Sequence, residues 1–279
     1  MKFNFLSYKK ALFIVGIMLC MIPQSLLAQS EKPKNLLLYD NQPYHFGFIL
    51  GYNQMSYAIK YNEGYQLVGH PATEYPSTAD TYFNANATYY THSATPVPEH
   101  GFVVGVVGNL RLGKYFDLRL IPSLSFGSRT IEYHFYRELP AGMTDNNPYF
   151  TKKKSIFSTF VEFPLQVKYK SKRLNNIAAY VIAGGNFKID LASQKKSQVD
   201  ITNAQGEQIT VTDNIRVKRV DLAAECGAGF DFYTGYFKFG IEAKMSFGLI
   251  NMLNKHNNQY DASINGLKNR MFQLSFTFE

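Results

Sequence analysis

The chain contains no tryptophan, only two cysteines and few charged residues, which make up 18% of its 279 positions. Low charge together with a hydrophobic content of 46% excludes an intrinsically disordered chain, a collagen-like fibre and a coiled coil. Long hydrophobic runs are also scarce. After the first apolar run, no further stretch reaches the roughly 18 residues that a membrane-spanning helix needs. The sequence therefore predicts no transmembrane helix in the processed chain.

The N-terminus is typical of a secretory signal peptide. Lys2, Lys9 and Lys10 precede an apolar run over 11–22, and Leu26-Leu27-Ala28 forms a plausible cleavage site. We therefore predict a signal peptide over residues 1–28 and a short periplasmic N-terminal segment over 29–43.

Cleavage would also change the cysteine and charge balance. Cys20 would leave with the signal, so Cys226 would remain as a single cysteine that cannot form an intrachain disulfide. Without the three leader lysines, 26 bases face 21 acids and the formal net charge falls from +8 to +5. A surplus this small does not indicate a nucleic-acid partner.

What the sequence does contain is typical of β-structure, with 23 Phe, 20 Tyr and 20 Gly against 11 Pro. Segments of strict apolar/polar alternation predict strands. They cover 44–59, 99–112, 115–131, 156–170, 177–191, 217–232, 236–247 and 271–279. Short turns at 113–114, 171–176 and 233–235 alternate with long polar connections at 60–98, 132–153, 192–216 and 248–270. We therefore predict an all-β fold over 44–279, an eight-stranded antiparallel up-and-down transmembrane β-barrel.

This connectivity also predicts location and orientation. Both termini share the short-turn end, which in an outer membrane is the periplasmic one. We expect an integral outer-membrane protein with both termini periplasmic, in contact with outer-membrane lipid and lipopolysaccharide.

The two faces of the predicted strands differ sharply. One face, from Phe46 to Phe278, is entirely apolar or glycine, whereas the interleaved face carries balanced charges. A soluble barrel with the apolar face inside is the alternative. The interior of eight strands is too narrow for that many aromatic rings, so we expect the apolar face to contact lipid.

The charged face is then the lumen, and its charges must pair. We expect a filled plug instead of an open pore. The candidate lumen network comprises Arg111, Asp117, Arg119, Glu162, Lys168, Asp221, Glu225, Glu242 and Lys244; the same face also carries Lys170, Lys188, Asp190, Arg219, Asp231, Lys238 and Glu279.

The stretch Phe-Val-Glu-Phe-Pro-Leu-Gln-Val-Lys-Tyr-Lys-Ser over 160–171 resembles a strand motif of the Bacteroidota outer-membrane β-barrel, porin-like superfamily. The order of the segments at 183–185, 221–230 and 240–249 is also similar. Gln166 departs from the aliphatic residue that many relatives have there.

Within that superfamily, residues 45–55 and the turn Lys170-Ser171-Lys172-Arg173 followed by Asn175-Asn176 resemble the PorT/SprT branch. The resemblance implies a part in type IX protein secretion and gliding motility, with other proteins of that machinery as partners. A small outer-membrane lipid-modifying enzyme, or a minor porin or structural barrel, remains the alternative.

Catalytic signals are weak. His134 lies beside Glu132 and follows Ser128 by six positions, which makes it the nearest candidate for rim catalysis. No nucleophile elbow, HExxH or CxxC motif accompanies it. We expect no enzyme activity, no cofactor, no metal and no small-molecule substrate.

Three surface features could instead contact partners. Lys170, Lys172 and Arg173 at a short turn are candidate docking residues. The run over 152–154 could face lipopolysaccharide. The first long connection is rich in aromatic residues, which suggests either a folded cap or a protein-contact site. These residues are Tyr61, Tyr65, Tyr75, Tyr82, Phe83, Tyr89 and Tyr90.

Overall fold

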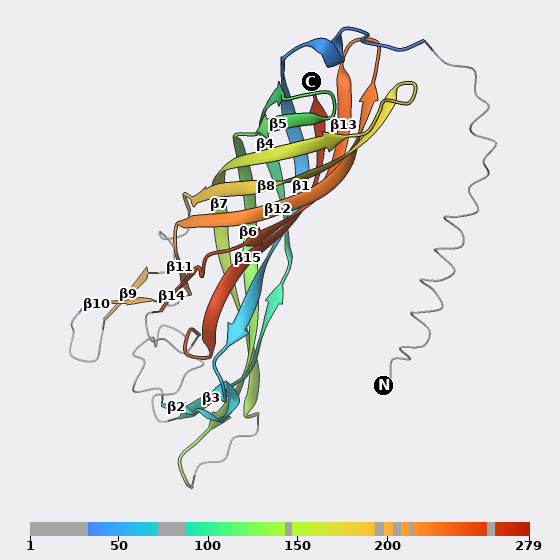
Figure 1. Cartoon of the computed structure of the whole chain (residues 1–279). Helices are drawn as coiled ribbons and strands as arrows, with labels where there is room; N and C mark the ends of the chain where they lie inside the picture. Colours follow the sequence, from blue (N-terminus) through green and yellow to red (C-terminus); the bar gives the residue numbers. More distant parts are fainter. Residues whose placement is uncertain are drawn as a thin grey trace, which may run out of the picture. The chain divides into compact units, whose positions relative to one another are not determined.

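The structure is a computed structural model that describes residues 33–71, 87–142, 147–192, 198–202, 208–212, 215–255 and 260–279. Its main feature is a closed ring of eight antiparallel strand positions (Figure 1). In chain order these are β1 (Tyr44–Tyr61), β4 (Glu99–Arg111), β5 (Phe116–Leu120) with β6 (Ser123–Glu138), β7 (Tyr149–Lys170), β8 (Ile177–Asp190), β12 (Val220–Tyr233), β13 (Lys238–Gly248) and β15 (Ile264–Phe278). Each pairs with its neighbours in the chain, and β1 closes the ring against β15. The predicted fold class is confirmed.

The third strand position is interrupted, contrary to the single predicted strand over 115–131. β5 ends at Leu120 and β6 begins at Ser123, with Ile121 and Pro122 between them. Proline has no amide hydrogen to donate to a neighbouring strand. Its carbonyl still accepts from the amide of Val106, and the amide of Ile121 donates to the carbonyl of Pro164, so the wall stays closed across the break.

Several strands continue into segments that the sequence pattern predicted as loops. β6 runs on to Glu138, β7 begins at Tyr149, β15 begins at Ile264, and an additional strand, β3 (Thr88–Val97), pairs with β6. Figure 1 shows these strands extending beyond the others at the end opposite the C-terminus. The smaller elements are η2 (Tyr39–Asn41), η3 (Tyr65–Leu67), β2 (His70–Pro71), the β9 (Gln198–Thr202) and β10 (Gln208–Thr212) pair, and the β11 (Arg216–Val217) and β14 (Leu253–Asn254) pair.

Around the turn-side part of the ring, the apolar face points outward. Phe46 is 70% exposed and Val106 is 58% exposed, whereas Arg119 and Glu162 are both 0% exposed. A contiguous exposed apolar surface of this extent would be costly in water. The assignment of faces made from the sequence therefore holds along this part of the barrel.

Farther from the termini, the two faces exchange their character. On β15 the outward residue changes from Phe272 to Arg270, while the inward residues become Met271 and Leu267. The inward face of β6 likewise changes from Ser125 and Arg129 to an apolar series. The resulting inner core contains Tyr57, Tyr89, Ile131, Tyr133, Phe135, Tyr260, Ile264 and Leu267, among others.

The barrel wall thus has two storeys, a turn-side part with a charged interior and a part farther from the turns with an apolar interior. The second storey corrects the sequence-based account, which described the whole interior as charged. The charged lumen covers only the turn-side part, and beyond Arg129 the inside is an aromatic core. The physical reason is the surrounding medium. A wall that stands in water carries polar residues outside and buries apolar ones inside, as soluble sheets do.

The exchange of faces predicts different responses to one introduced charge. Leu274→Arg places a cation on the outward apolar belt and is expected to destabilise the barrel by about 2–4 kcal/mol in lipid. Thr95→Arg places the same cation on the exposed outward face of β3 and is expected to cost less than about 0.5 kcal/mol. Equilibrium urea unfolding in lipid vesicles measures both, and equal costs at the two sites would contradict the assignment of the belt to lipid.

Candidate functional site

The turn-side lumen is filled by ion pairs that join different strands. Nearest the termini, Lys238 contacts Glu279 at 2.6 Å and Lys168 contacts Asp231 at 2.7 Å. Lys170 contacts Asp117 at 2.9 Å. Each pair bridges strands across the ring wall or the lumen, so these contacts hold the closed ring together as well as neutralising its inside.

The middle of the lumen is centred on two linked clusters. Arg119 and Glu242, both completely buried, are 2.6 Å apart, and the Tyr180 hydroxyl donates to the same carboxylate oxygen at 3.1 Å. In the second cluster, Glu225 accepts from Lys244 at 3.1 Å and from Gln166 at 2.6 Å.

One amide side chain connects this second cluster to a further acid. The Asn186 amide donates to Glu225 at 2.7 Å and to Glu162 at 2.8 Å, and Lys188 lies 3.7 Å from Glu162. Two carboxylates therefore share an amide donor and have a lysine on either side. Such shared partners offset the cost of burying two acidic side chains in a narrow space.

Arg129 lies at the end of the charged lumen that is farthest from the short turns. The sequence analysis did not single it out. Its guanidinium contacts Asp190 at 2.9 Å and lies between the rings of Tyr57 and Phe160, at 4.9 and 4.8 Å from their centroids. It also donates to Ser158 and Asn269, and Asn269 donates to Asp221 at 2.7 Å. The signal was available, because Arg129 has the same strand parity as Arg119.

The structure brings together most of the predicted lumen network, with two corrections. Arg111 is only half-buried at the turn-side mouth, where its Nε donates to the carbonyl of Gly113 at 3.1 Å. Arg219, which shares the predicted charged face, is exposed. Arg111 keeps the inward register of β4, opposite Asp117, but is the last residue of that strand, whereas Arg219 precedes β12, where alternation no longer determines which side of the wall a side chain occupies.

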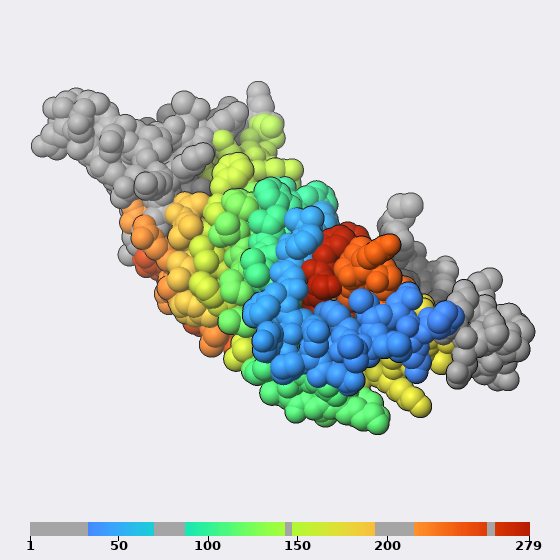
Figure 2. All heavy atoms as spheres, turned by 90° about the horizontal axis from the view of Figure 1, so that it is seen from above, coloured from blue at the N-terminus to red at the C-terminus, as the bar shows by residue number. Residues whose placement is uncertain are grey.

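A strap formed by residues 35–42 crosses the turn-side mouth (Figure 2). Tyr39 of η2 donates to Glu279 at 3.1 Å, its ring stacks on His45 at 3.8 Å, and Lys238 lies 4.9 Å from its centroid. Burial raises the pKa of the Tyr39 phenol, so this hydroxyl remains a donor.

The other half of the strap is held by the turn between β7 and β8. Asn35 donates its backbone amide to Asn176 at 2.9 Å, and Asp40 accepts from the Tyr233 hydroxyl at 2.9 Å. Arg173 donates to Asn176 at 2.7 Å and stacks on Tyr233, 3.8 Å from the ring centroid. The sequence analysis placed a segment over 29–43 here but did not predict that it closes the barrel.

A family model described as "Outer membrane protein beta-barrel domain" matches residues 27–254. The chain belongs to this family. It is an outer-membrane β-barrel protein, and the outward apolar belt of the turn-side storey is its lipid-facing surface. No helix among the described residues is long and apolar enough to span a membrane.

Three solved structures match this chain over nearly their whole length. The attachment invasion locus protein Ail of Yersinia pestis has 10% identity and a TM-score of 0.31, with 85% of this chain and 98% of that chain covered. Neisserial surface protein A has 8% identity, a TM-score of 0.36 and coverage of 85% and 99%. The outer membrane protease OmpT of Escherichia coli has 11% identity, a TM-score of 0.33 and coverage of 85% and 95%. Among curated proteins, no relative matches.

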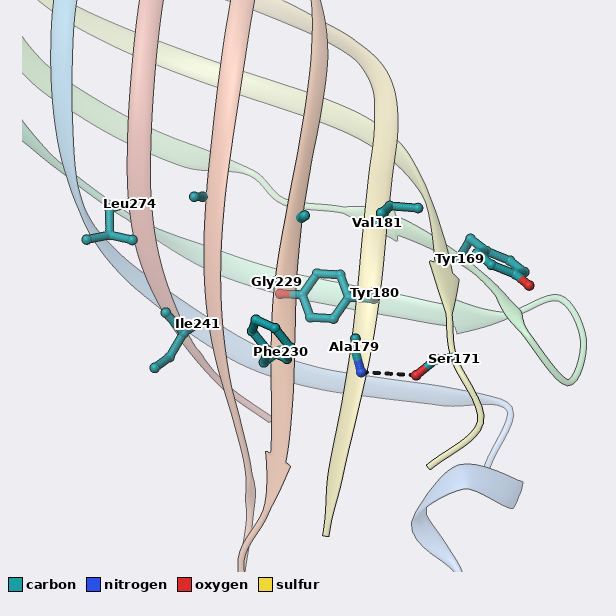
Figure 3. A pocket seen from close by; sticks show the side chains of 11 residues that line it. Tyr169, Ser171, Ala179, Tyr180, Val181, Gly229, Phe230, Ile241 and Leu274 are labelled. Atoms are coloured by element: carbon teal, nitrogen blue, oxygen red, sulfur yellow. Dashed lines mark hydrogen bonds between the residues drawn. The ribbon is translucent and has the colours of Figure 1, made fainter. Parts of the chain in front are cut away.

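The lipid-facing wall of this outer-membrane barrel is hollowed over β8, β12 and β13. The hollow measures about 470 Å³ and is floored by small residues, with Tyr169, Phe230, Ile241 and Leu274 around it (Figure 3). A Cβ on Gly229 would lie 2.6 Å from the ring of the lumen residue Tyr180, so only glycine allows the two to meet.

The three predicted docking residues have different surroundings. Lys170 is paired with Asp117. Arg173 donates to Asn176, which holds the strap, whereas Lys172 is exposed. All three line a hollow of about 220 Å³ at the turn-side end, together with Arg111, Lys114 and Asp40. The predicted cluster therefore exists as one basic surface, in which Lys172 and Lys114 provide the exposed charge.

His134 lies on the outward face of β6, beyond the lipid-facing belt. Its Nδ1 is 3.0 Å from the Thr151 hydroxyl on β7, and its Nε2 is 3.9 Å from Glu132, which also pairs with Lys153 at 3.3 Å. The nearby hydroxyl is thus Thr151 instead of the predicted Ser128.

Within the described ranges, no three His, Cys, Asp or Glu side chains are grouped as metal ligands. His70 has no described side chain, and Tyr75, Tyr82, Phe83 and His256 lie outside the described residues.

The buried Arg119–Glu242 pair predicts strongly non-additive stability effects. Arg119→Met alone leaves Glu242 as an uncompensated buried charge and is expected to cost about 3–5 kcal/mol. The double variant Arg119→Met/Glu242→Leu removes both charges and is expected to recover most of that loss. Urea unfolding of the barrel in lipid measures the cycle, and additive losses would show that the two side chains do not depend on each other.

Proposed function

We propose that this outer-membrane barrel is a non-enzymatic component of the type IX protein secretion and gliding-motility machinery, with both termini in the periplasm. The filled lumen carries the proposal. Arg119, Glu242 and Lys168 occupy the ring centre, and the strap covers the mouth. A barrel of this kind contributes through its surfaces, and partners meet it at the membrane faces.

The residues that carry the branch resemblance support a role for the turn-side end. His45, whose Nε2 lies 2.8 Å from the Tyr39 carbonyl, holds the strap. Arg173 and Asn176 hold its other half, and Asn175 adopts a left-handed conformation with φ 53° that shapes the turn. These residues build one surface, consisting of the strap and the basic turn.

The strand motif over 160–171 supports a different part of the assignment from the turn-side residues. Its polar residues Glu162, Gln166 and Lys168 all point into the lumen and are almost completely buried. They contact β8 and β12, through Asn186, Glu225 and Asp231. This motif therefore supports membership of the barrel family, while the strap and turn support the finer assignment.

The exposed charge of the turn-side surface indicates the chemistry of a partner. Lys114 and Lys172 stand beside the engaged Arg173 around the 220 Å³ hollow. We propose an acidic periplasmic surface of another secretion protein as the partner. Complementary charge favours encounter and orientation of two such surfaces.

The proposal is tested in the native bacterium by deleting the gene and measuring the export of surface cargo. The deletion is expected to abolish export, and the wild-type gene to restore it. Lys114→Glu/Lys172→Glu is expected to restore export only to about a tenth, because charge reversal repels an acidic partner. Lys218→Glu/Lys268→Glu makes the same charge change at the opposite end and is expected to restore export fully.

Equal amounts of each variant in the outer membrane establish that folding is unaffected. Normal export in the deletion strain would refute the assignment to secretion. Release of a product from lipopolysaccharide by the purified barrel, abolished by His134→Ala, would instead establish a lipid-modifying enzyme.

A further inference from the structure

The part of the wall that extends beyond the lipid-facing belt carries a row of tyrosines on its outward face. Tyr90 on β3 pairs in register with Tyr136 on β6, which pairs with Tyr149 on β7. The ring centroids are 6.0 and 5.2 Å apart, with interplanar angles of 45° and 49°. The tilted rings line a shallow groove.

This row is not part of the aromatic core of the same strands. Tyr89, Phe135 and Phe150, each next to one of the three tyrosines in sequence, point to the other side and pack together inside. The aromatic core is therefore formed by these inward neighbours and not by the outward tyrosines. Tyr149 remains 62% exposed, so the outward row offers aromatic surface to solvent at a place where the fold does not need it.

A short helical turn forms one wall of the groove. Gly64, with φ 66°, makes the left-handed step before η3, and Tyr65 of η3 stacks on Tyr61 at 4.8 Å. This positions Gln66, whose amide donates to the His92 carbonyl at 2.8 Å. Opposite, the Glu138 carboxylate accepts from the Tyr90 hydroxyl at 2.9 Å. Polar groups thus frame the aromatic rings on two sides.

The resulting tyrosine cleft, lined by Gln66, Tyr90, His92, Tyr136, Glu138 and Tyr149, has a volume of about 290 Å³. This volume is just below the roughly 300–1,000 Å³ range of ligand sites. Its aromatic faces suit the C–H faces of a pyranose ring, while the carboxylate, amide and hydroxyl groups suit sugar hydroxyls. Among the described residues that line it, Glu138 is the sole acid and none is a lysine or arginine, which disfavours an anionic ligand.

We propose that the tyrosine cleft binds a neutral pyranose residue of a polysaccharide. Two sources share this chemistry. One is the sugar part of the cell's own lipopolysaccharide, and the other is a polysaccharide from the surroundings. The site lies at the end of the barrel away from the strap and is independent of the proposed secretion role.

The test uses the full-length barrel in detergent micelles. One arm measures binding to polysaccharide released by mild acid from the bacterium's own lipopolysaccharide, and the other uses an array of neutral and anionic oligosaccharides. The wild type is expected to bind a neutral sugar in at least one arm, and the responding arm identifies the source. Tyr136→Ala/Tyr149→Ala is expected to weaken binding at least about tenfold, whereas Tyr136→Phe, which keeps the ring, is expected to lose less than about threefold.

Thr95→Ala, on the same outward face but outside the cleft, is the matched control and is expected to bind as the wild type does. Unchanged unfolding profiles separate lost binding from lost folding. The proposal is overturned if the wild type binds no neutral sugar in either arm, if only anionic sugars bind, or if the double tyrosine variant binds as well as the wild type. Capture of a protein at this face, in place of a sugar, would also overturn it.

Discussion

Every charge inside the turn-side lumen must find a partner there, and this constraint shapes the rest of the barrel. The pairs Arg119–Glu242 and Lys168–Asp231 join strands that are well separated in the sequence, and Lys244–Glu225 joins the neighbouring strands β12 and β13. Because an unpaired buried charge is so costly, the correct ring is strongly favoured over slipped or open alternatives. The same pairs occupy the space through which solute would have to move, so closure of the ring and closure of the lumen have one physical cause.

The two storeys of the wall follow from the medium around each. In the lipid-facing storey the polar side chains gather inside and the apolar ones outside, and beyond it the order reverses. Arg129 lies at the level of the reversal, with its charge on Asp190 and its flat faces on Tyr57 and Phe160. Arginine suits this boundary, since its planar guanidinium can pair with a carboxylate and stack on rings at once.

Much of the barrel was predictable because a strand in a membrane wall alternates with period two. The strand positions, the outward belt and most lumen residues followed from this alternation, including Glu225 and Lys244. The extension by β3, β6 and β15 did not, because the polarity of both faces reverses there and the pattern no longer reports a lipid-facing strand. Arg219 was misplaced for a related reason, since it precedes β12 and parity does not hold beyond strand ends, whereas Arg111 keeps its parity but lies at the open end of β4. The strap and the tyrosine cleft depend on contacts between distant segments, such as Tyr39 with Glu279, which no local pattern reveals.

The central claim is that side chains close this lumen. Recording ionic current through the purified full-length barrel in planar lipid bilayers tests it most directly. The account predicts a current no greater than the leak of the bare bilayer over a wide voltage range, because the Arg119–Glu242 level and the strap both occlude the path. Stable, stepwise conductance from the wild-type protein would contradict it and would show that the ion pairs line a channel instead of filling the barrel.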